Sequence, residues 1–235
     1  MANKWTYASD GGEKYPVSYG QLWAANGHLY HCQDLEAEKS DWTDDVARLR
    51  PKLVYTDPPW GAGNARTFRT KAGVDGALGR AVNTINLHKK ILEPFAALKI
   101  LAYVETGLRE EHELKRVAAE LGGVCVGRWD ITYYQTKPCV LFAFDFGETK
   151  PYTLPNLNGM DDDDTPLAVF KHHLAEGFLR EGNLIADPCA GRGLTAASAN
   201  KVGLQALTNE LHPNRISCAM WKINKATKAE PQRIR

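Results

Sequence analysis

The sequence lacks the features that mark membrane, exported and metal-scaffold proteins. No stretch of its 235 residues approaches the roughly 20 apolar residues that a membrane-spanning helix needs, and its first residues contain no apolar signal core. The five cysteines are scattered, with no Cys-x-x-Cys pair and no Cys/His cluster at zinc spacing. We therefore expect a cytoplasmic protein with reduced thiols, no metal and no membrane partner.

The sequence also lacks an excess of charge of either sign. It has 29 Lys and Arg against 28 Asp and Glu, a net charge of +1, whereas many nucleic-acid binders are strongly basic. Any contact with nucleic acid must therefore come from local patches. With 43% hydrophobic and 24% charged residues, the composition is typical of a globular protein and excludes disordered classes. No repeat or long linker divides the chain, so we expect one domain over residues 1–235.

Short apolar runs alternate with helical patterns along the chain. Strands are expected at 28–33, 53–56, 99–105, 124–132, 139–146, 184–187 and 205–209, and helices at 41–49, 81–98, 109–121, 166–180, 194–202 and 212–223. This alternation predicts an α/β fold with a mostly parallel, doubly wound sheet. The strands at 124–132 and 139–146 have no helix between them, so they should form an antiparallel hairpin at the sheet edge. Two segments, 61–80 and 149–164, are expected to be long loops.

The strongest motif is Asp57-Pro58-Pro59-Trp60, directly after the apolar run 53–55. The prolines fix φ and lack an N–H, so the ring geometry directs the nearby carbonyl groups. Asp57 and the carbonyl of Pro58 can accept both hydrogens of one NH2 group, while Trp60 offers a flat face to a heterocycle. Two acceptors would draw the lone pair of an exocyclic amine back onto nitrogen. The alternative for this motif alone is a Pro-rich turn with a core tryptophan.

A second motif starts where an apolar run ends in Asp187 and continues through Gly191-x-Gly193 into a helix. Glycine there permits close approach of the backbone to a ligand. The next strand ends in Glu210, at about the 20-residue spacing of the acid that bonds ribose hydroxyls in nucleotide-binding sheets. The pattern indicates a nucleoside-containing cofactor, and a plain strand-to-helix turn is the alternative.

The two motifs, in this order, resemble the β-class of amino-methyltransferases, which use S-adenosylmethionine (SAM) to methylate exocyclic amines in nucleic acids. The resemblance covers residues 28–215. It implies a Rossmann-like SAM-dependent methyltransferase fold with a mostly parallel seven-stranded sheet and one antiparallel edge strand. An aspartate at the head of the catalytic motif favours adenine N6, because cytosine enzymes of the family usually carry serine there. The chain is thus expected to be a DNA adenine-N6 methyltransferase that acts on a flipped-out adenine in duplex DNA and releases S-adenosylhomocysteine.

Two alternatives remain, an RNA adenosine-N6 methyltransferase and a catalytically silent SAM-fold subunit of a methyltransferase complex. The intact Asp57–Trp60 motif argues against a silent subunit. A dehydrogenase fits poorly, because the third glycine of its fingerprint is missing. Only residues 147–164 stand in place of a full target-recognition domain, so the enzyme would rely on its loops, on a homodimer or on a partner subunit.

The resemblance also implies a role for each motif residue. The catalytic residues would be Asp57, Pro58, Pro59 and Trp60, which hold the target amine and stack on the base. The cofactor-binding residues would be Asp34, Leu35, Asp57, Thr165, Asp187, Pro188, Ala190, Gly191, Arg192, Gly193, Glu210 and Leu211. Thr165 stands where the family usually has lysine, and Arg192 replaces a common serine.

Nucleic acid is expected to contact the segment 61–80. Its candidate substrate-binding residues are Arg66, Phe68, Arg69, Lys71 and Arg80. Positive charge with an aromatic side chain, next to the catalytic motif, fits a loop that grips phosphates. A solvated glycine-rich loop is the alternative. The run Asp161–Asp164 is interpreted as a solvated acidic turn that restricts how a duplex docks.

Overall fold

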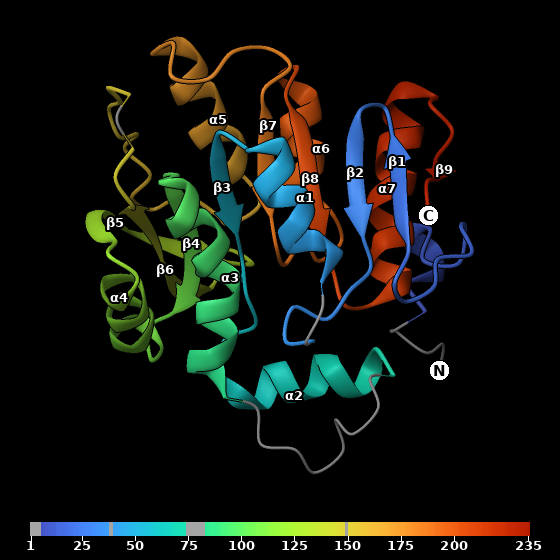
Figure 1. Ribbon diagram of the computed structural model, residues 1–235, viewed down its shortest axis with the longest axis horizontal. Helices are drawn as coiled ribbons and strands as arrows, with labels where there is room; N and C mark the ends of the chain where they lie inside the picture. The colour runs from blue at the N-terminus through green and yellow to red at the C-terminus, as the bar shows by residue number, and fades with distance from the viewer. Residues whose placement is uncertain (1–5, 38–39, 74–82, 149) are drawn as a thin grey trace.

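The computed structural model describes residues 6–37, 40–73, 83–148 and 150–235. These residues form a nine-stranded sheet with helices on both faces (Figure 1). The strands are β1 (Leu22–Ala25), β2 (His28–His31), β3 (Leu53–Thr56), β4 (Ala102–Gly107), β5 (Val124–Tyr133), β6 (Lys137–Asp145), β7 (Leu184–Asp187), β8 (Gln205–Asn209) and β9 (Gln232–Arg233). The α-helices are α1 (Asp41–Leu49), α2 (Gly61–Lys71), α3 (Thr84–Leu98), α4 (Glu111–Glu120), α5 (Thr165–Ala175), α6 (Leu194–Lys201) and α7 (Pro213–Thr227).

The sheet order is β5-β6-β4-β3-β7-β8-β2-β1-β9. The strands β4, β3, β7, β8 and β2 run parallel, which confirms the expected α/β fold with a mostly parallel sheet. The expected hairpin, β5 and β6, lies at one edge, and its antiparallel strand β6 is the inner of the two. Beyond the seven expected strands, β1 and β9 extend the other edge. Neither of these strands was expected from the sequence, and β9 has only two residues.

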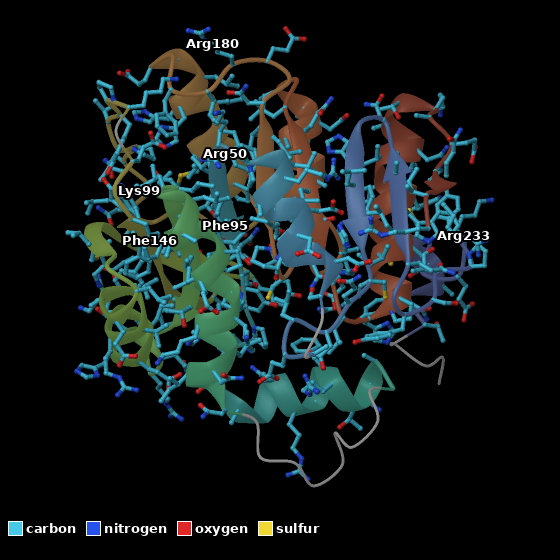
Figure 2. The ribbon with its side chains drawn as sticks, in the orientation of Figure 1. Arg50, Phe95, Lys99, Phe146, Arg180 and Arg233 are labelled. Atoms are coloured by element: carbon cyan, nitrogen blue, oxygen red, sulfur yellow. The ribbon has the colours of Figure 1, made fainter. Side chains whose placement is uncertain are left out.

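The hydrophobic core lies in two layers, one on each face of the sheet. Helices α1, α3 and α4 pack on one face and α5, α6 and α7 on the other. Within β3, Val54 packs in the first layer, with α1, α3 and α4. Leu53 and Tyr55 pack in the second layer, with α5, α6 and α7. Because helices cover both faces, such strands appear as continuous apolar runs in the sequence. Phe95 on α3, labelled in Figure 2, is fully buried in the first layer.

Helix α2 lies across the end of the sheet at which the parallel strands terminate (Figure 1). We expected a loop over 61–80, because the segment is rich in glycine, and for Gly61–Lys71 that expectation is wrong. Ala65, Phe68 and Arg69 lie on one face of this helix at i, i+3 and i+4, and Ala65 and Arg69 are buried. A buried arginine on that face hides the amphipathic pattern. Arg80 lies outside the described residues.

Among the described residues, no helix combines the length and the apolar character that crossing a membrane requires.

A buried and an exposed valine of the β5–β6 hairpin allow a matched test of this packing. Val140 is fully buried between sheet and helices, whereas Val126 is 36% exposed. We expect Val140→Ala to lower the free energy of unfolding by about 2 kcal/mol, through lost burial and the cavity left behind. Val126→Ala should change it by less than about 0.5 kcal/mol. Urea unfolding followed by circular dichroism measures both, and equal losses would contradict the difference in burial between the two valines.

Candidate active site

A pocket of about 630 Å³ opens at the carboxyl ends of the parallel strands. Its size is typical of small-molecule sites, and its position is where open α/β sheets bind ligands. Most of the residues expected to bind cofactor or substrate line it: Asp34, Leu35, Asp57, Pro58, Pro59, Trp60, Phe68, Arg69, Asp187, Pro188, Ala190, Gly191, Arg192, Glu210 and Leu211. Two motifs that are about 130 residues apart in sequence therefore meet in one cavity, because β3 and β7 are neighbours.

Of the expected residues that the structure describes, four do not line this pocket. Arg66 and Lys71 are exposed on the outer side of α2. Gly193 is the N-cap of α6 at φ +80°, where an added Cβ would collide with Ala219 of α7. Its glycine thus serves close packing of two helices. Thr165 is fully buried.

Asp57 is the carboxylate at the end of β3 and is exposed to the pocket. Its Oδ1 accepts a 2.8 Å hydrogen bond from the indole nitrogen of Trp60, and its Oδ2 has no partner among the described residues. Desolvation by the surrounding protein raises the pKa of Asp57 to about 7, and the charges of Asp162 and Asp187 add to this effect, against the Trp60 hydrogen bond. The carboxylate is therefore poised to gain or lose a proton near neutral pH.

Trp60 also belongs to an aromatic wall formed with Tyr133 and Tyr134, at the tip of the β5–β6 hairpin. The ring centroids of Trp60 and Tyr133 are 5.0 Å apart in an edge contact, and those of Tyr133 and Tyr134 are 4.1 Å apart. All three side chains line the pocket. This wall is the natural contact for a flat heterocycle.

The hairpin tip is held by the acidic run that we interpreted as a solvated turn. Asp162 Oδ1 accepts the backbone N–H of Tyr134 at 3.1 Å, and Asp161 Oδ2 accepts that of Gln135 at 2.6 Å. Tyr134 and Gln135 have φ angles of 51° and 60°. Asp162 is buried, and burial raises its pKa to about 6. The expected solvated turn is thus wrong for these two aspartates, which bind backbone groups that no sequence pattern places.

The turn after β7 presents a carboxylate and backbone groups to the pocket. Asp187 is 2% exposed, and its Oδ1 accepts the N–H of Cys189 at 3.0 Å. Burial raises the pKa of Asp187 to about 6, against the hydrogen bonds from Thr195 and Cys189. Gly191, at φ +54°, donates its N–H to Glu210 Oε2 at 2.9 Å. The two parts of the second motif are therefore joined directly.

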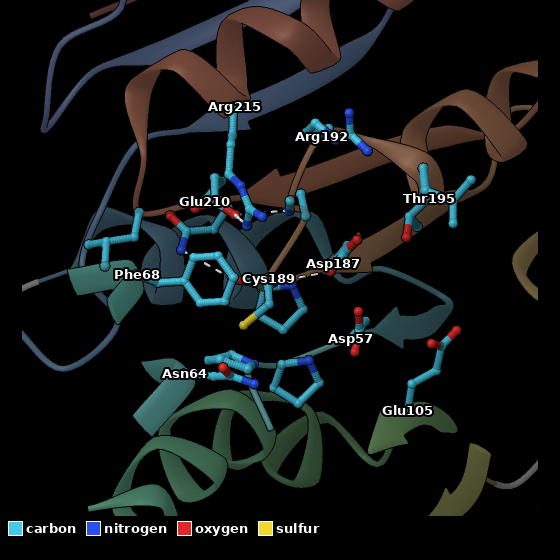
Figure 3. A pocket seen from close by; sticks show the side chains of 18 of the residues that line it. Asp57, Asn64, Phe68, Glu105, Asp187, Cys189, Arg192, Thr195, Glu210 and Arg215 are labelled. Atoms are coloured by element: carbon cyan, nitrogen blue, oxygen red, sulfur yellow. Dashed lines mark hydrogen bonds and ion pairs between the residues drawn. The ribbon is translucent and has the colours of Figure 1, made fainter. Parts of the chain in front are cut away.

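Glu210 is oriented by the backbone at both oxygens. Besides Gly191 on Oε2, the N–H of His212 donates to Oε1 at 2.9 Å. Arg215 of α7 lies 3.6 Å from Oε2, and its guanidinium lies 4.4 Å from the ring centroid of Phe68 on α2 (Figure 3). Sequence reasoning missed Arg215. Its place in the first turn of the helix that follows Glu210 is the signal that could have indicated it.

Arg69 does not face solvent as a phosphate-gripping residue would. It is 9% exposed, and its two Nη atoms each lie 2.8 Å from a different oxygen of Asp34. Its Nη1 also lies 3.0 Å from Glu36. Such a forked pair is a strong, directional contact. It fixes α2 to the segment after β2 and occupies the carboxylate of Asp34, which we expected to contact a cofactor.

Beneath Asp57, Thr165 joins a buried hydrogen-bond network. Its Oγ1 lies 3.2 Å from Glu105 Oε1 and 3.0 Å from the carbonyl oxygen of Asp162, and it also contacts the hydroxyl of Tyr55. Tyr55 donates to Glu105 Oε1. Glu105 ends the strand expected at 99–105, so the strand-end position of this acid was the signal for a pocket residue that we missed.

Figure 3 shows that Asp57, Asp187 and Glu105 border the same part of the pocket. Within the parts of the chain that the structure describes, no group of three or more His, Cys, Asp or Glu side chains is arranged to hold a metal ion.

No family model matches the sequence, and a comparison with curated proteins finds no match either. Solved structures do match. M1.HpyAVI in complex with SAM has a TM-score of 0.55 at 12% identity, over 83% of this chain and 98% of that one. TTHA0409 of Thermus thermophilus in complex with SAM has a TM-score of 0.52 at 16% identity, over 78% and 90%. The cytosine-N4-specific PvuII DNA methyltransferase has a TM-score of 0.50 at 12% identity, over 87% and 90%.

The protein has the α/β methyltransferase fold. At these identities the likeness concerns the fold.

The ion pair between Arg69 and Asp34 allows a test of whether Arg69 stabilises the fold or is an exposed residue that contacts phosphate. Arg69→Ala leaves Asp34 unpaired at a largely buried position, so we expect the free energy of unfolding to fall by about 3 kcal/mol. Arg66→Ala, one turn away on the exposed face, should change it by less than about 0.5 kcal/mol. Urea unfolding of both variants gives the comparison. Equal free energies of unfolding for the two variants would contradict the structural role of Arg69 and indicate that it is an exposed cation.

The buried carboxyl of Asp187 makes stability depend on pH. Its pKa is about 6 in the folded chain and 3.8 as the reference for the unfolded chain, so ionisation opposes folding increasingly as pH rises from 4 to 6 and fully above that. We expect Asp187→Asn to be more stable than the wild type by about 2 kcal/mol at pH 7.5, with the difference largely lost at pH 4.5.

Unfolding in urea at the two pH values measures this difference. Asp44→Asn, on the exposed side of α1, is the matched control and should differ from the wild type by less than about 0.5 kcal/mol at both. Destabilisation of the chain by Asp187→Asn at pH 7.5 would contradict the buried-charge argument.

Proposed function

We propose that the protein is a SAM-dependent DNA methyltransferase that acts on the N6 amine of adenine. The observation that carries this proposal is that Asp57-Pro58-Pro59-Trp60 and the Asp187–Glu210 acceptor set line one pocket of a methyltransferase fold. Two of the similar structures are complexes with SAM, and a third is a DNA methyltransferase. Neither motif alone would favour this function over a plain turn.

The residues of the pocket fit SAM by their chemistry. When bound, SAM supplies a methyl group made electrophilic by its positively charged sulfur. Asp57 and Asp187 are acids in a shared cavity, which favours a cationic ligand. Glu210, whose oxygens are each held by one backbone N–H, keeps lone pairs for the hydroxyls of a ribose. Gly191 leaves its side of the turn open to a ligand.

Asp57 and Pro58 would grip the target amine. Asp57 Oδ2 has no partner among the described residues, and Pro58 lines the same wall of the pocket. Two acceptors on one NH2 group oppose delocalisation of its lone pair and fix its direction, so the chain's contribution is positioning and electrostatics. With a pKa of about 7, Asp57 can also hold the proton that the methylated amine must release.

The choice of adenine rests on the aspartate that heads the motif. The fold itself does not distinguish the two amines, since the cytosine-N4-specific PvuII enzyme is among the similar structures. Exposed Arg66 and Lys71 on α2 would contact phosphates at the rim. The aromatic wall of Trp60, Tyr133 and Tyr134 would hold a base taken out of its stack.

The test is product identity. The protein is incubated with SAM and separate pools of duplex DNA, single-stranded DNA and RNA, which are digested to nucleosides and analysed by mass spectrometry. N6-methyldeoxyadenosine in the duplex pool supports the proposal. N6-methyladenosine in RNA alone would show that the substrate is RNA, and N4-methylcytosine would show that the target base is cytosine. No product in any pool would favour a catalytically silent subunit.

The catalytic role of Asp57 predicts a separation of binding and transfer. Asp57→Ala removes the acceptor for the amine but leaves Glu210 and the glycine turn in place. We expect methyl transfer to fall by at least about 1,000-fold, with the SAM dissociation constant measured by calorimetry changed less than about fivefold. Asp44→Ala is the control and should retain activity. Normal turnover by Asp57→Ala would contradict this mechanism.

A further inference from the structure

Glu105 is a buried carboxyl group with one oxygen left open to the pocket. It is 2% exposed at the carboxyl end of β4, beside Asp57. Its Oε1 accepts from Tyr55 and lies 3.2 Å from the hydroxyl of Thr165. Its Oε2 has no hydrogen-bond partner among the described residues and is not sealed from solvent. This second oxygen therefore faces the cavity that Glu105 lines.

The groups around Glu105 favour its neutral form. Asp57 follows β3 and Asp162 precedes α5, and both add negative charge, while Tyr55 of β3 and Cys139 of β6 are neutral. In the described parts of the chain, no Lys or Arg forms an ion pair with Glu105. Burial, and after it the charge of Asp57, raises the pKa of Glu105 well above its usual range, against the hydrogen bonds from the hydroxyls of Tyr55 and Thr165, which lower it.

The position of the proton follows from the hydrogen bonds. Because Oε1 already accepts from the Tyr55 hydroxyl, the acid proton belongs on Oε2. A carboxylic acid in this state is a hydrogen-bond donor aimed at the cavity, next to a carboxylate, Asp57, that is an acceptor. The two side chains together present one acceptor and one donor side by side.

That pair complements one edge of two nucleobases. Adenine carries its N6 amine beside the ring acceptor N1, and cytosine carries its N4 amine beside N3. Guanine and thymine instead carry an N–H at the corresponding ring position. We propose that Glu105 is a substrate-recognition residue, which donates a hydrogen bond from Oε2 to the ring nitrogen adjacent to the target amine.

This inference rests on the function proposed above and extends it. Asp57 and Pro58 hold the amine, and Glu105 fixes the rotation of the base in its own plane. A site that hydrogen-bonds a ring nitrogen also rejects bases that offer an N–H there, since two donors would then face each other without an acceptor. The residues that would recognise the base thus lie in β4 and directly after β3, two neighbouring strands of the sheet.

Two substitutions of Glu105 test whether its side chain acts as a hydrogen-bond donor or as a negative charge. Glu105→Gln keeps an NH2 donor at nearly the same place and cannot ionise, so kcat/KM on unmethylated duplex DNA should stay within about threefold of the wild type. Glu105→Ala removes the donor and should lower kcat/KM by about 30-fold, the effect of one lost hydrogen bond in a closed site. Glu181→Gln, on an exposed glutamate, is the matched control.

A base analogue tests the atom that Glu105 contacts. In a short duplex that contains the mapped methylation site, 1-deazaadenine replaces the target base and removes only the N1 acceptor. The wild type should lose about 30-fold on this substrate, whereas Glu105→Ala should lose little more than it has already lost. A 7-deazaadenine duplex, altered on the other side of the ring system, should show equal effects on the two enzymes.

The pH profile gives a third readout that a purely structural role would not change. In the wild type, kcat/KM should fall on the alkaline side as Glu105 loses its proton, and this fall should be absent in Glu105→Gln. Circular dichroism and calorimetry with SAM should show both variants folded and able to bind cofactor.

The outcomes distinguish two failures. If the wild type methylates no base, the proposed function is wrong and this role for Glu105 falls with it. If the wild type methylates DNA but Glu105→Gln is as impaired as Glu105→Ala, Glu105 acts as a charge and only the inference is overturned. Equal losses on 1-deazaadenine for the wild type and Glu105→Ala would overturn it in the same way.

Discussion

The gathering of desolvated carboxyl groups in one cavity is the constraint on which the pocket depends. Asp57, Asp187 and Glu105 come from the ends of three adjacent parallel strands and meet where the sheet stops. The pKa of each is raised, and desolvation by the surrounding protein is the main cause in all three. The chain stabilises them with neutral donors such as the Trp60 indole, the Tyr55 hydroxyl and the N–H of Cys189. Neutral donors orient a carboxyl group without cancelling its charge, so the cavity keeps an affinity for cations.

Two arginines near the pocket, Arg69 and Arg215, hold α2 in place and form no ion pair with Asp57, Asp187 or Glu105 among the described residues. Arg69 joins α2 to Asp34 and Glu36, and Arg215 places its guanidinium between Glu210 and the ring of Phe68. Both contacts connect the helix across the end of the sheet to the segments that follow β2 and β8. Helix α2 is therefore held by the ion pairs of Arg69 and by the contact of the Arg215 guanidinium with the Phe68 ring.

The parts of this arrangement that could be predicted are those that depend on local pattern. The bounds expected for 41–49, 53–56, 184–187 and 205–209 coincide with α1, β3, β7 and β8. Buried parallel strands give continuous apolar runs, and an amphipathic helix has a clear 3.6-residue periodicity. The two motifs were placed at strand ends because a strand and its terminal acid are adjacent in sequence. Their meeting in one cavity then follows from the rule for open α/β sheets.

The rest depended on partners distant in sequence. Helix α2 was expected as a loop, since its buried face includes Arg69, a residue that propensity places in solvent and that Asp34 and Glu36 draw inward. The aspartates at 161 and 162 were expected in solvent, yet they accept N–H groups from a hairpin tip 26 to 28 residues away. No composition or spacing rule encodes such pairings, because each is decided by which loops pack together.

Thr165 shows how one such pairing bears on chemistry. The family to which the two motifs are similar usually has lysine at this position, and the hydroxyl here lies 3.2 Å from Glu105. An ammonium at that distance would favour the ionised form of the carboxyl and lower its pKa. A hydroxyl lowers the pKa of Glu105 only through its hydrogen bond and supplies no charge, so burial and the charge of Asp57 still hold that pKa above its usual range. On the recognition role inferred for Glu105, an uncharged side chain at position 165 allows this acid to remain a hydrogen-bond donor, so the two positions act together.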